Sequence, residues 1–311
     1  MKLRLLFLIV VFIGTSVDGR SDTRAHTCPA TTIPTLQVLG SGGPIADDGR
    51  ASSGYLIWID GRSKILIDAG GGVFLRFGEA GARFDDLDFI AISHFHADHS
   101  TDLVALLKSG YFSDRSRKLP ISGPAAGGVY PGIHAYLERL LSLDHGAYAY
   151  LNGYLDGSAG LVKLQPVEVD PKLEHPSDIY TDPGADIEIH AIGVPHGPVP
   201  ALAYRIRIGQ RSIVFAGDQN GGSDSFIDFA RGADVLVMHL AVPENISGIG
   251  RNLHAPPSVI GRIAAETGAG KLVLSHFMAR SLFNREENLK IIRSRYSGPV
   301  VSADDLICIN L

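Results

Sequence analysis

Short apolar runs, bounded by turn-forming residues, fill the first third of the chain. Glycine- and proline-rich segments, among them GSGGP and DAGGG, separate these runs, which is typical of strands. In the helical pattern that ends this part, Ile133, Tyr136, Leu137 and Leu140 share one face. The pattern predicts strands at 35–39, 55–60, 63–68 and 89–93, and helices at 101–112 and 131–142.

A second, similar batch of strands and helices follows a glycine- and tyrosine-rich segment, 143–160, which we expect to be a loop that could cover a site. In each batch, strands first follow one another directly, as in a β-meander, and then alternate with helices. This order favours sheets that contain both parallel and antiparallel strands. We therefore predict an α/β fold, a four-layer αββα sandwich, as a single domain over residues 20–311. The predicted strands are 161–169, 186–194, 201–208, 211–217, 234–240, 271–275 and 305–310, with helices at 257–267 and 285–296.

Residues 1–19 have the layout of a secretory signal peptide. Lys2 and Arg4 precede an apolar run, 5–13, that is shorter than the roughly 20 residues of a spanning helix. The pattern predicts an exported protein, periplasmic or secreted, without a stable membrane span; an uncleaved anchor is the alternative. In an oxidising compartment Cys28 and Cys308 could pair, or they could remain two separate thiols.

Composition and charge narrow the choice of partner. The 311 residues carry a net charge of −5 at neutral pH. A large nucleic-acid footprint would need a basic face or arm. We therefore expect no nucleic-acid partner; the oligomeric state is open, with a dimer as one option.

The stretch SHFHADHS, 93–100, holds the densest candidate chemistry. It follows an apolar run that predicts a buried strand, and loops at strand ends commonly carry binding residues. His94 and His96 are two apart and point the same way in extended geometry. Asp98 and His99 fall on the turn into the next helix. Imidazole and carboxylate together suit zinc, manganese or iron(II). The alternative is a polar helix start that Asp98 or Ser100 merely caps.

Four such groups in one loop suggest two metals, which need ligands from elsewhere. Three ionisable residues end apolar strand-like runs in the second batch: His196, Asp218 and His276. Taken singly, Asp218 could be a turn-former and His196 a structural loop histidine. The repetition of one pattern at three strand ends favours ligands.

These motifs resemble the ligand set of the metallo-β-lactamase fold superfamily. VLGSGGP, LIDAG and KLVLSHF are similar to the ribonuclease Z and arylsulfatase branch. The resemblance implies two divalent metal ions, zinc first, with manganese or iron(II) as alternatives. It implies one ion held by His94, His96 and His196, a second held by Asp98, His99 and His276, Asp218 bridging them, and Asp68 of LIDAG steadying the metal loop.

The remaining chemistry is assigned by the same resemblance. Asp98 would orient or deprotonate the attacking water, and His254 would donate a proton to the leaving group. Ala255 follows His254 where the family usually has Ser or Thr. Leu240 follows His239 where a Glu often stands. We therefore expect His239 to contact the metal ligands rather than to bind a metal itself. Arg280 could hold an anionic substrate group or form a surface ion pair.

The resulting hypothesis is an exported hydrolase whose metal-bound hydroxide attacks a small phosphodiester or aryl sulfate ester, with a small anionic molecule as substrate. A lactonase or another ester or amide hydrolase on the same metal core is the first alternative. A metal-binding protein without catalysis is the second.

Overall fold

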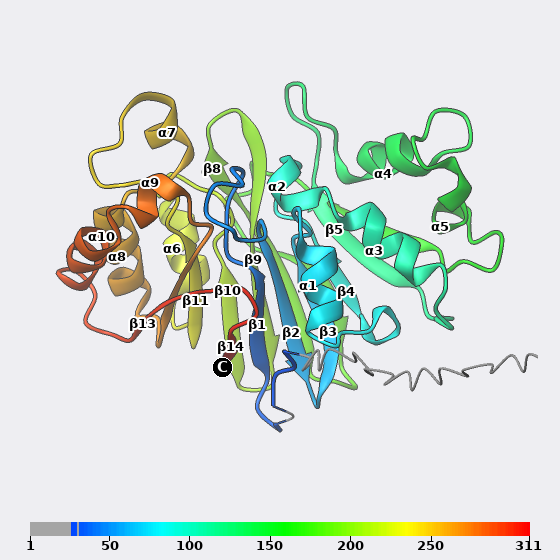
Figure 1. Cartoon of the computed structure of the whole chain (residues 1–311), viewed down its shortest axis with the longest axis horizontal. Coiled ribbons are helices and arrows are strands. Elements are labelled where there is room, and N and C mark those ends of the chain that lie inside the picture. The colour runs from blue at the N-terminus through cyan, green and yellow to red at the C-terminus, as the bar shows by residue number, and fades with distance from the viewer. Residues whose placement is uncertain (1–25, 30) are drawn as a thin grey trace, which may run out of the picture.

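Two seven-stranded mixed sheets form the centre of the computed structural model, which describes residues 26–29 and 31–311 (Figure 1). The first sheet has the order β14-β1-β2-β3-β4-β5-β6 and the second β13-β12-β11-β10-β9-β8-β7. The first comprises β1 (Thr35–Gly40), β2 (Gly54–Ile59), β3 (Arg62–Ile67), β4 (Phe89–Ala91), β5 (Leu119–Pro124), β6 (Leu164–Val169) and β14 (Cys308–Asn310). The second comprises β7 (Ser177–Asp182), β8 (Ile187–His196), β9 (Val199–Ile208), β10 (Arg211–Phe215), β11 (Val235–His239), β12 (Leu272–Ser275) and β13 (Val300–Ser302).

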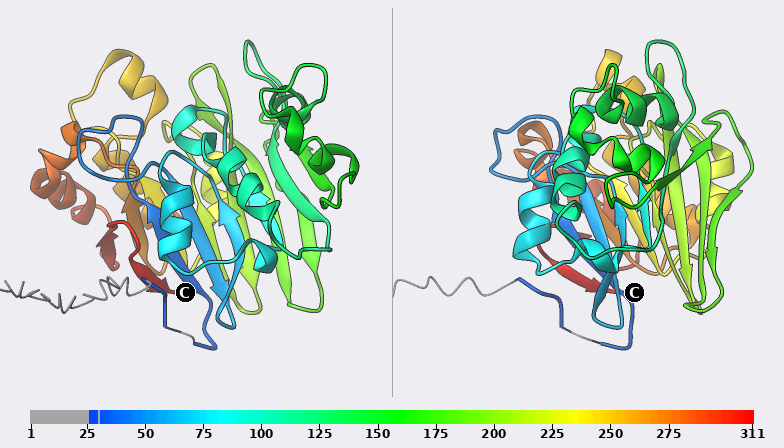
Figure 2. Two further views of the ribbon diagram at one scale, coloured as in Figure 1. Left: turned by 45° about the vertical axis from the view of Figure 1, so that its right-hand side comes forward. Right: turned by 90° about the vertical axis from the view of Figure 1, so that its right-hand side faces the viewer.

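Helices lie on the outer face of each sheet. Figure 2 shows the helices of the first half outside the first sheet and the strands of the second sheet on its other side. The first half contributes α1 (Val73–Glu79), η1 (Phe84–Asp86), α2 (Ala97–Ser100), α3 (Leu103–Gly110), α4 (Ile133–Leu141), η2 (Ala149–Leu151) and α5 (Gly153–Asp156). The second contributes α6 (Asp224–Ala230), α7 (Gly248–Leu253), α8 (Pro257–Thr267), α9 (Ala279–Leu282) and α10 (Arg285–Arg293).

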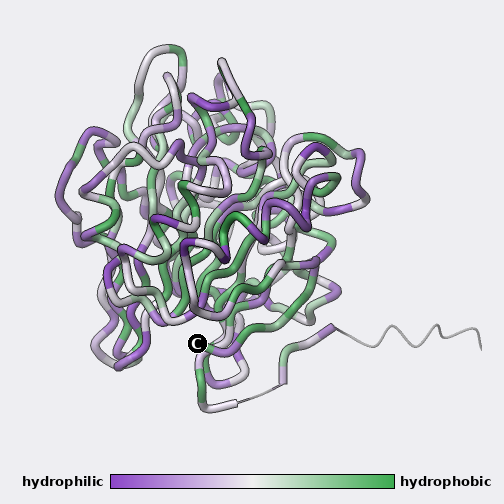
Figure 3. Tube along the Cα trace, turned by 90° about the vertical axis from the view of Figure 1, so that its left-hand side faces the viewer, coloured by the Kyte–Doolittle hydropathy of each residue, from purple (hydrophilic) through white to green (hydrophobic). Residues whose placement is uncertain are grey.

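Three apolar cores hold these four layers together. Ile65 and Ile67 of β3 face the core between the sheets, whereas Leu66 faces the core under α1, α3 and α4. In the second sheet Val237 faces inward and Leu236 packs toward α6 and α8. Both faces of the central strands are therefore buried, which explains their continuous apolar sequences. Figure 3 shows hydrophobic stretches of the chain running through the interior of the molecule. The predicted αββα sandwich is confirmed.

Several elements were not predicted, for local reasons. β5 contains Pro120 and Pro124, which weaken a strand pattern. β7, SDIYTD, is a half-exposed edge strand with little apolar content. Helices α1 and α6 have seven residues each, too few for a clear helical period.

The segment 143–160 contains η2 and α5 and is not simply a loop. Tyr154 is fully buried in the core beneath α3, and its hydroxyl donates to the Leu107 carbonyl at 2.6 Å. The segment therefore packs against α3 and α4.

A disulfide joins Cys28 to Cys308, so the first described residues are tied to β14. The predicted signal peptide, 1–19, lies outside the described residues. Among the helices of residues 26–29 and 31–311, none is long and apolar enough to cross a membrane.

Candidate metal centre

The histidines and aspartates predicted from the sequence meet at one edge of the two sheets. The strands that carry them belong to both sheets, and each side chain lies at or just after the carboxyl end of its strand. In Figure 1 this is the upper edge, between α2, the tip of β8 and α7. The positions are His94–His99 after β4, His196 at the end of β8, Asp218 after β10, His239 at the end of β11, and His276 after β12.

One group of side chains comprises His94, His96, His196 and Asp218. One potential ligand atom from each lies within 4.8 Å of the others. His94 Nε2 is 3.0 Å from His96 Nδ1, and Asp218 Oδ2 is 3.5 Å from His196 Nε2. All are buried except His96, which is partly exposed. Three imidazoles and a carboxylate therefore face one small volume.

A second group comprises Asp98, His99 and His276, again within 4.8 Å of one another. Asp98 Oδ2 lies 3.2 Å from His276 Nε2 and 3.5 Å from His99 Nε2. Asp218 lies between the two groups, because its Oδ1 is 3.3 Å from His276 Nε2 while its Oδ2 is 3.7 Å from His99 Nε2.

Asp68 fixes the orientation of His99. Its Oδ2 is 2.7 Å from His99 Nδ1 and accepts the Ser93 hydroxyl at 2.8 Å, while its Oδ1 accepts the Ser93 backbone N–H at 2.7 Å. Asp68 has a left-handed backbone with φ of 58°, which is unusual for a residue with a side chain. The strained turn after β3 is thus held by contacts with the metal loop.

His239 contacts Asp218 directly and connects it to a residue that the sequence analysis missed. His239 Nδ1 is 2.6 Å from Asp218 Oδ1, and its Nε2 is 3.0 Å from the hydroxyl of Tyr55. A carboxylate only accepts, so Nδ1 carries the proton and Nε2 accepts the tyrosine O–H. Tyr55 is 184 positions away in β2, and nothing in its local sequence marks it.

His254 lies beside Asp218, His196 and His276. It follows α7 directly, is 7% exposed, and its Nδ1 is 3.8 Å from Asp218 Oδ2. The preceding Leu253 carbonyl accepts a hydrogen bond from His196 Nδ1 at 2.9 Å. The α7 segment therefore orients one histidine and brings another to the cluster.

Arg280 lies on α9 and is exposed. Its Nε donates to the Ala241 carbonyl at 3.1 Å, two residues beyond His239. The alternative of a surface ion pair is not met among the described residues, since no carboxylate lies within 4.0 Å of its guanidinium nitrogens.

The carboxylates and histidines set one another's charge. Burial opposes ionisation of Asp218, but His276, His254 and His99 hold its carboxyl pKa well below the usual range. Burial also opposes the charge on His99, but Asp68, Asp98 and Asp218 raise its pKa to about 10. Burial lowers the pKa of His254 to about 3 and that of His239 to about 4. In the metal-free protein His99 is thus a cation, while His239 and His254 are neutral.

The cluster fits a divalent metal ion. His99 Nε2 and His196 Nε2 are buried without a hydrogen-bond partner in the described part of the chain. On both rings the other nitrogen, Nδ1, is hydrogen-bonded, which is the usual arrangement for a histidine that ligates through Nε2. Buried ring nitrogens without a partner are costly, and a metal ion would satisfy them.

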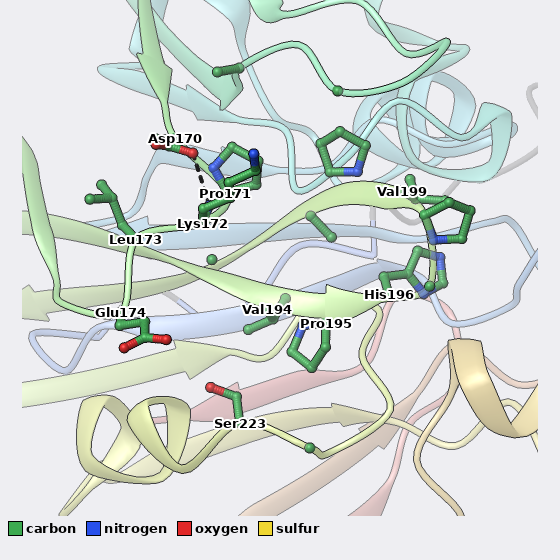
Figure 4. Close-up of a pocket in the computed structure, with 18 of the residues that line it drawn as sticks. Asp170, Pro171, Lys172, Leu173, Glu174, Val194, Pro195, His196, Val199 and Ser223 are labelled. Carbon is green, nitrogen blue, oxygen red and sulfur yellow. Dashed lines mark hydrogen bonds between the residues drawn. The ribbon is translucent and has the colours of Figure 1, made fainter.

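A groove of about 1060 Å³ opens beside the cluster and has His196 in its wall (Figure 4). Loops after β5 and β6, the hairpin of β8 and β9, and the start of α6 line it. The lining residues are 125–128, 170–174, 193–201 and 222–225.

Comparison with known proteins identifies the family. A sequence model described as a Beta-lactamase superfamily domain matches residues 63–277, which is more than half of the chain and extends from β3 to just beyond His276. The chain therefore belongs to the beta-lactamase superfamily. It is a metal-dependent hydrolase of this superfamily, and the relatives named below support placing it in the ribonuclease Z branch.

Those relatives include ribonuclease Z of Mycobacterium bovis (strain BCG / Pasteur 1173P2), which is 28% identical over 284 residues that cover 87% of this chain and 96% of that protein. Ribonuclease Z of Thermobifida fusca (strain YX) is 25% identical, covering 88% and 93%. Human tRNase Z, short form, has the same fold, with a TM-score of 0.69, 18% identity, and coverage of 89% of this chain and 98% of that one.

Two predictions are wrong in the light of these relatives. The expectation of a small anionic substrate without nucleic acid conflicts with relatives named for the cleavage of RNA. The net charge misled because it is a sum over the whole surface and says little about a local binding site. The prediction of export to the periplasm or beyond is also wrong, because it conflicts with relatives named ribonuclease Z that match over 87% of the chain. A basic start followed by a short apolar run was insufficient evidence for export.

Proposed function

We propose that this protein is a dinuclear metal-dependent phosphodiesterase that cleaves RNA. The observation that carries the proposal is the convergence of two histidine-containing groups on the two oxygens of Asp218. Relatives named ribonuclease Z, matched over 87% of the chain, support RNA as the substrate.

Two ions would be held by the two groups. His94, His96 and His196 would bind the first, and Asp98, His99 and His276 the second, with Asp218 bridging both. Nitrogen and carboxylate donors favour Zn²⁺, and the same set also accepts Mn²⁺ or Fe²⁺. When bound, a pair of such ions lowers the pKa of a shared water and stabilises the negative charge that develops on the phosphate.

Three further contacts would hold these ligands in place. Asp68 fixes His99, the Leu253 carbonyl fixes His196, and His239 fixes Asp218. Such contacts set which ring nitrogen is free for the metal and reduce the motion of the ligand.

In the reaction, Asp98 would orient the attacking water. The Asp98 carboxyl stays ionised because, although burial opposes it, the charge of His99 and the hydrogen bond to His276 keep its pKa low. Arg280, exposed four residues after His276, would contact a phosphate of the substrate.

His254 would return a proton to the leaving oxygen. Its ring is neutral in the free protein, since burial lowers its pKa to about 3. The negative charge of a bound phosphodiester raises the pKa of a nearby histidine, so the ring takes up a proton from solvent when substrate binds. That proton passes to the leaving oxygen as the P–O bond breaks.

The proposal is tested with purified protein and two RNAs, a transfer-RNA precursor with extra nucleotides at its end and an unstructured oligonucleotide. Cleavage of RNA by the metal-loaded protein, its loss after chelation and its return with Zn²⁺ are the expected results. Turnover of a homoserine lactone with no cleavage of either RNA would instead support the lactonase alternative.

His254→Ala separates metal binding from proton transfer. We expect full metal content and RNA cleavage reduced by about 10²- to 10⁴-fold. The loss should be much smaller for bis(p-nitrophenyl) phosphate, because its leaving group needs no proton. An equal loss for both substrates would remove His254 from the proposed chemistry.

A further inference from the structure

His276 differs from other buried histidines of the centre in what holds its ring. The Nδ1 atoms of His99 and His196 are hydrogen-bonded to Asp68 and to the Leu253 carbonyl, and these contacts fix both rings. The Nδ1 atom of His276 is buried, and among residues 26–29 and 31–311 it has no hydrogen-bond partner. The orientation of the His276 ring must therefore come from its backbone and from packing.

The backbone of His276 is held by the loop 41–51, which connects β1 to β2 and lies beside α9 (Figure 1). His276 has a left-handed backbone with φ of 55°, which is unfavourable for a residue with a side chain. The next residue pairs with the loop: the Phe277 N–H donates to the Ser41 carbonyl, and the Gly43 N–H donates to the Phe277 carbonyl, each at 2.8 Å. This pairing fixes the chain directly after the left-handed turn.

The same loop packs against the His276 ring. A Cβ atom on Gly43 would lie 2.8 Å from Cε1 and 3.0 Å from Nδ1 of that ring. The backbone of Gly43 is not left-handed, so glycine is required here for its small size rather than for its conformational freedom. The loop thus forms the wall against which the imidazole rests.

Asp305, between β13 and β14, joins the two ends of this loop. Its Oδ1 accepts the backbone N–H and the hydroxyl of Ser41 at 2.9 and 2.8 Å. Its Oδ2 accepts the Ala51 N–H at 2.9 Å and Arg76 Nε at 3.2 Å. The Asp305 side chain is 12% exposed, and hydrogen bonds to a carboxylate are among the stronger ones, so these four contacts hold the loop firmly.

Arg50 is a second brace on the loop. Its Nη1 donates to the Ser41 hydroxyl and to the Ala303 carbonyl, and its Nη2 donates to Asp304 at 2.7 Å. Its guanidinium carbon lies 5.3 Å from the centre of the Phe277 ring, within the range of a cation–π contact. One side chain therefore joins the loop, the residue that pairs with it and the segment before β14.

We propose that Asp305 and Arg50 are positioning residues for the second metal ion, because they hold loop 41–51 against His276 and so direct its Nε2 toward that ion. The inference rests on the proposed two-ion centre and adds a support from distant segments that the ligand set alone does not require. His276 belongs to the group with Asp98 and His99 and not to the group with His94. Loosening the loop should therefore weaken one ion and spare the other.

The test is a titration of metal-free protein with Zn²⁺ against a chromogenic chelator, which counts the ions and gives each affinity. Gly43→Ala puts a methyl group against the His276 ring, so the affinity for one ion should fall by about 10- to 100-fold while the other stays unchanged. The matched control is Gly71→Ala, whose Cβ would meet nothing nearer than Ser52 Oγ at 3.9 Å. It should keep both affinities.

Asp305→Asn tests the brace at a distance from the ring. The amide keeps the shape of the side chain but turns an N–H toward groups that are themselves donors, so the same ion should be weakened by about tenfold. Asp88→Asn is the control, because it removes another buried carboxylate, one that accepts from Lys64 at 2.8 Å and from Arg117. It should lower stability without changing either Zn²⁺ affinity.

Two single-ion backgrounds decide which ion is affected. His96→Ala removes a ligand of the first ion, and His99→Ala removes a ligand of the second. Gly43→Ala should weaken the ion that remains in the His96→Ala protein and leave unchanged the ion that remains in the His99→Ala protein.

The outcomes separate this inference from the proposed centre. If the wild-type protein binds fewer than two Zn²⁺ ions, the proposed centre fails and the inference fails with it. If the wild type binds two ions and Gly43→Ala and Asp305→Asn bind both as tightly, the inference is overturned and the centre stands. Equal weakening of both ions, or a loss in Asp88→Asn as large as in Asp305→Asn, also overturns it, because the effect would then be general.

Discussion

Among single residues, Asp218 has the most contacts at the centre, and His239 determines how it is presented. With Oδ1 hydrogen-bonded to His239, Asp218 Oδ2 faces His94, His99 and His196 at 3.5–3.9 Å. Tyr55 in turn donates to the other nitrogen of His239 and so fixes which nitrogen bears the proton. The bridging aspartate is thus oriented through two buried side chains that lie behind it.

This arrangement gives a prediction for His239. His239→Ala should weaken Zn²⁺ affinity by about 10- to 100-fold, the usual effect of losing a group that orients a ligand. His239→Asn keeps a donor near the position of Nδ1 and should recover much of the affinity, whereas His239→Gln should not. Competition with a chromogenic chelator measures all three. If His239 were itself a metal ligand, Asn would be no better than Ala.

The raised pKa of His99 also predicts how the stability of the protein and its affinity for Zn²⁺ depend on pH. The pKa of His99 is raised to about 10 in the metal-free protein, above its unfolded value of about 6.5. Its contribution to stability is therefore complete below pH ~6.5 and is lost as the pH rises through about 10. A metal ion must displace this proton, so the affinity for Zn²⁺ should increase as the pH rises.

Titration of the metal-free protein with Zn²⁺ between pH 6 and 8 checks this expectation. Affinity should rise by about tenfold per pH unit for each proton displaced. Over the range from pH 6.5 to 9.5 the melting temperature of the metal-free protein should fall. A pH-independent affinity would mean that His99 binds no metal.

The residues of the centre differ in how far the sequence alone predicts them. His94, His96, Asp98 and His99 were recognisable because they crowd one strand end, and the other candidates because each ends an apolar run. Tyr55 could not be found, because it reads as one apolar strand residue and gains its role only from a partner 184 positions away.

At the level of elements, the turns that follow the strands position the side chains of the metal centre. Gly217, between β10 and Asp218, has φ of 60°, and a Cβ there would lie 2.5 Å from the Leu202 carbonyl oxygen. The turn must therefore be both left-handed and close to β9. This path of the backbone directs the Asp218 side chain toward the histidines.

Gly217→Ala should therefore damage both stability and metal binding. The left-handed backbone alone costs about 1–2 kcal/mol with a side chain, and the steric clash adds about 1–3 kcal/mol. Gly232→Ala is the matched control, because Gly232 has φ of 68° but open space around its Cβ. Chemical denaturation and Zn²⁺ titration of both variants test this, and equal effects would show that the contact with β9 is unimportant.

Elements were predicted well where burial dictates the pattern and poorly where it does not. The central strands are apolar on both faces and were found with nearly correct bounds. Edge strand β7 and the proline-containing β5 were missed, because their pairing is decided by neighbours in the sheet rather than by their own sequence.

In the whole molecule, the disulfide links two residues near opposite ends of the described chain. Cys28 and Cys308 are 280 positions apart, so their bond ties the first described residues to β14. Replacing both by serine should lower stability by about 2–5 kcal/mol. Thermal unfolding with and without a reducing agent checks this: the wild-type protein should melt lower when reduced, and the double variant should not respond. An unaltered wild-type melt would contradict a stabilising role.

For the molecule as a whole, we propose that two metal ions held between the two sheets would allow the protein to cleave RNA. This proposal is tested most directly by measuring the RNA cleavage rate as Zn²⁺ is added stepwise to metal-free protein. We predict a rate that rises and saturates at two equivalents, and no such rise in Asp218→Ala. A protein that binds two equivalents and cleaves no RNA, or one whose cleavage is complete without added metal, would contradict the account.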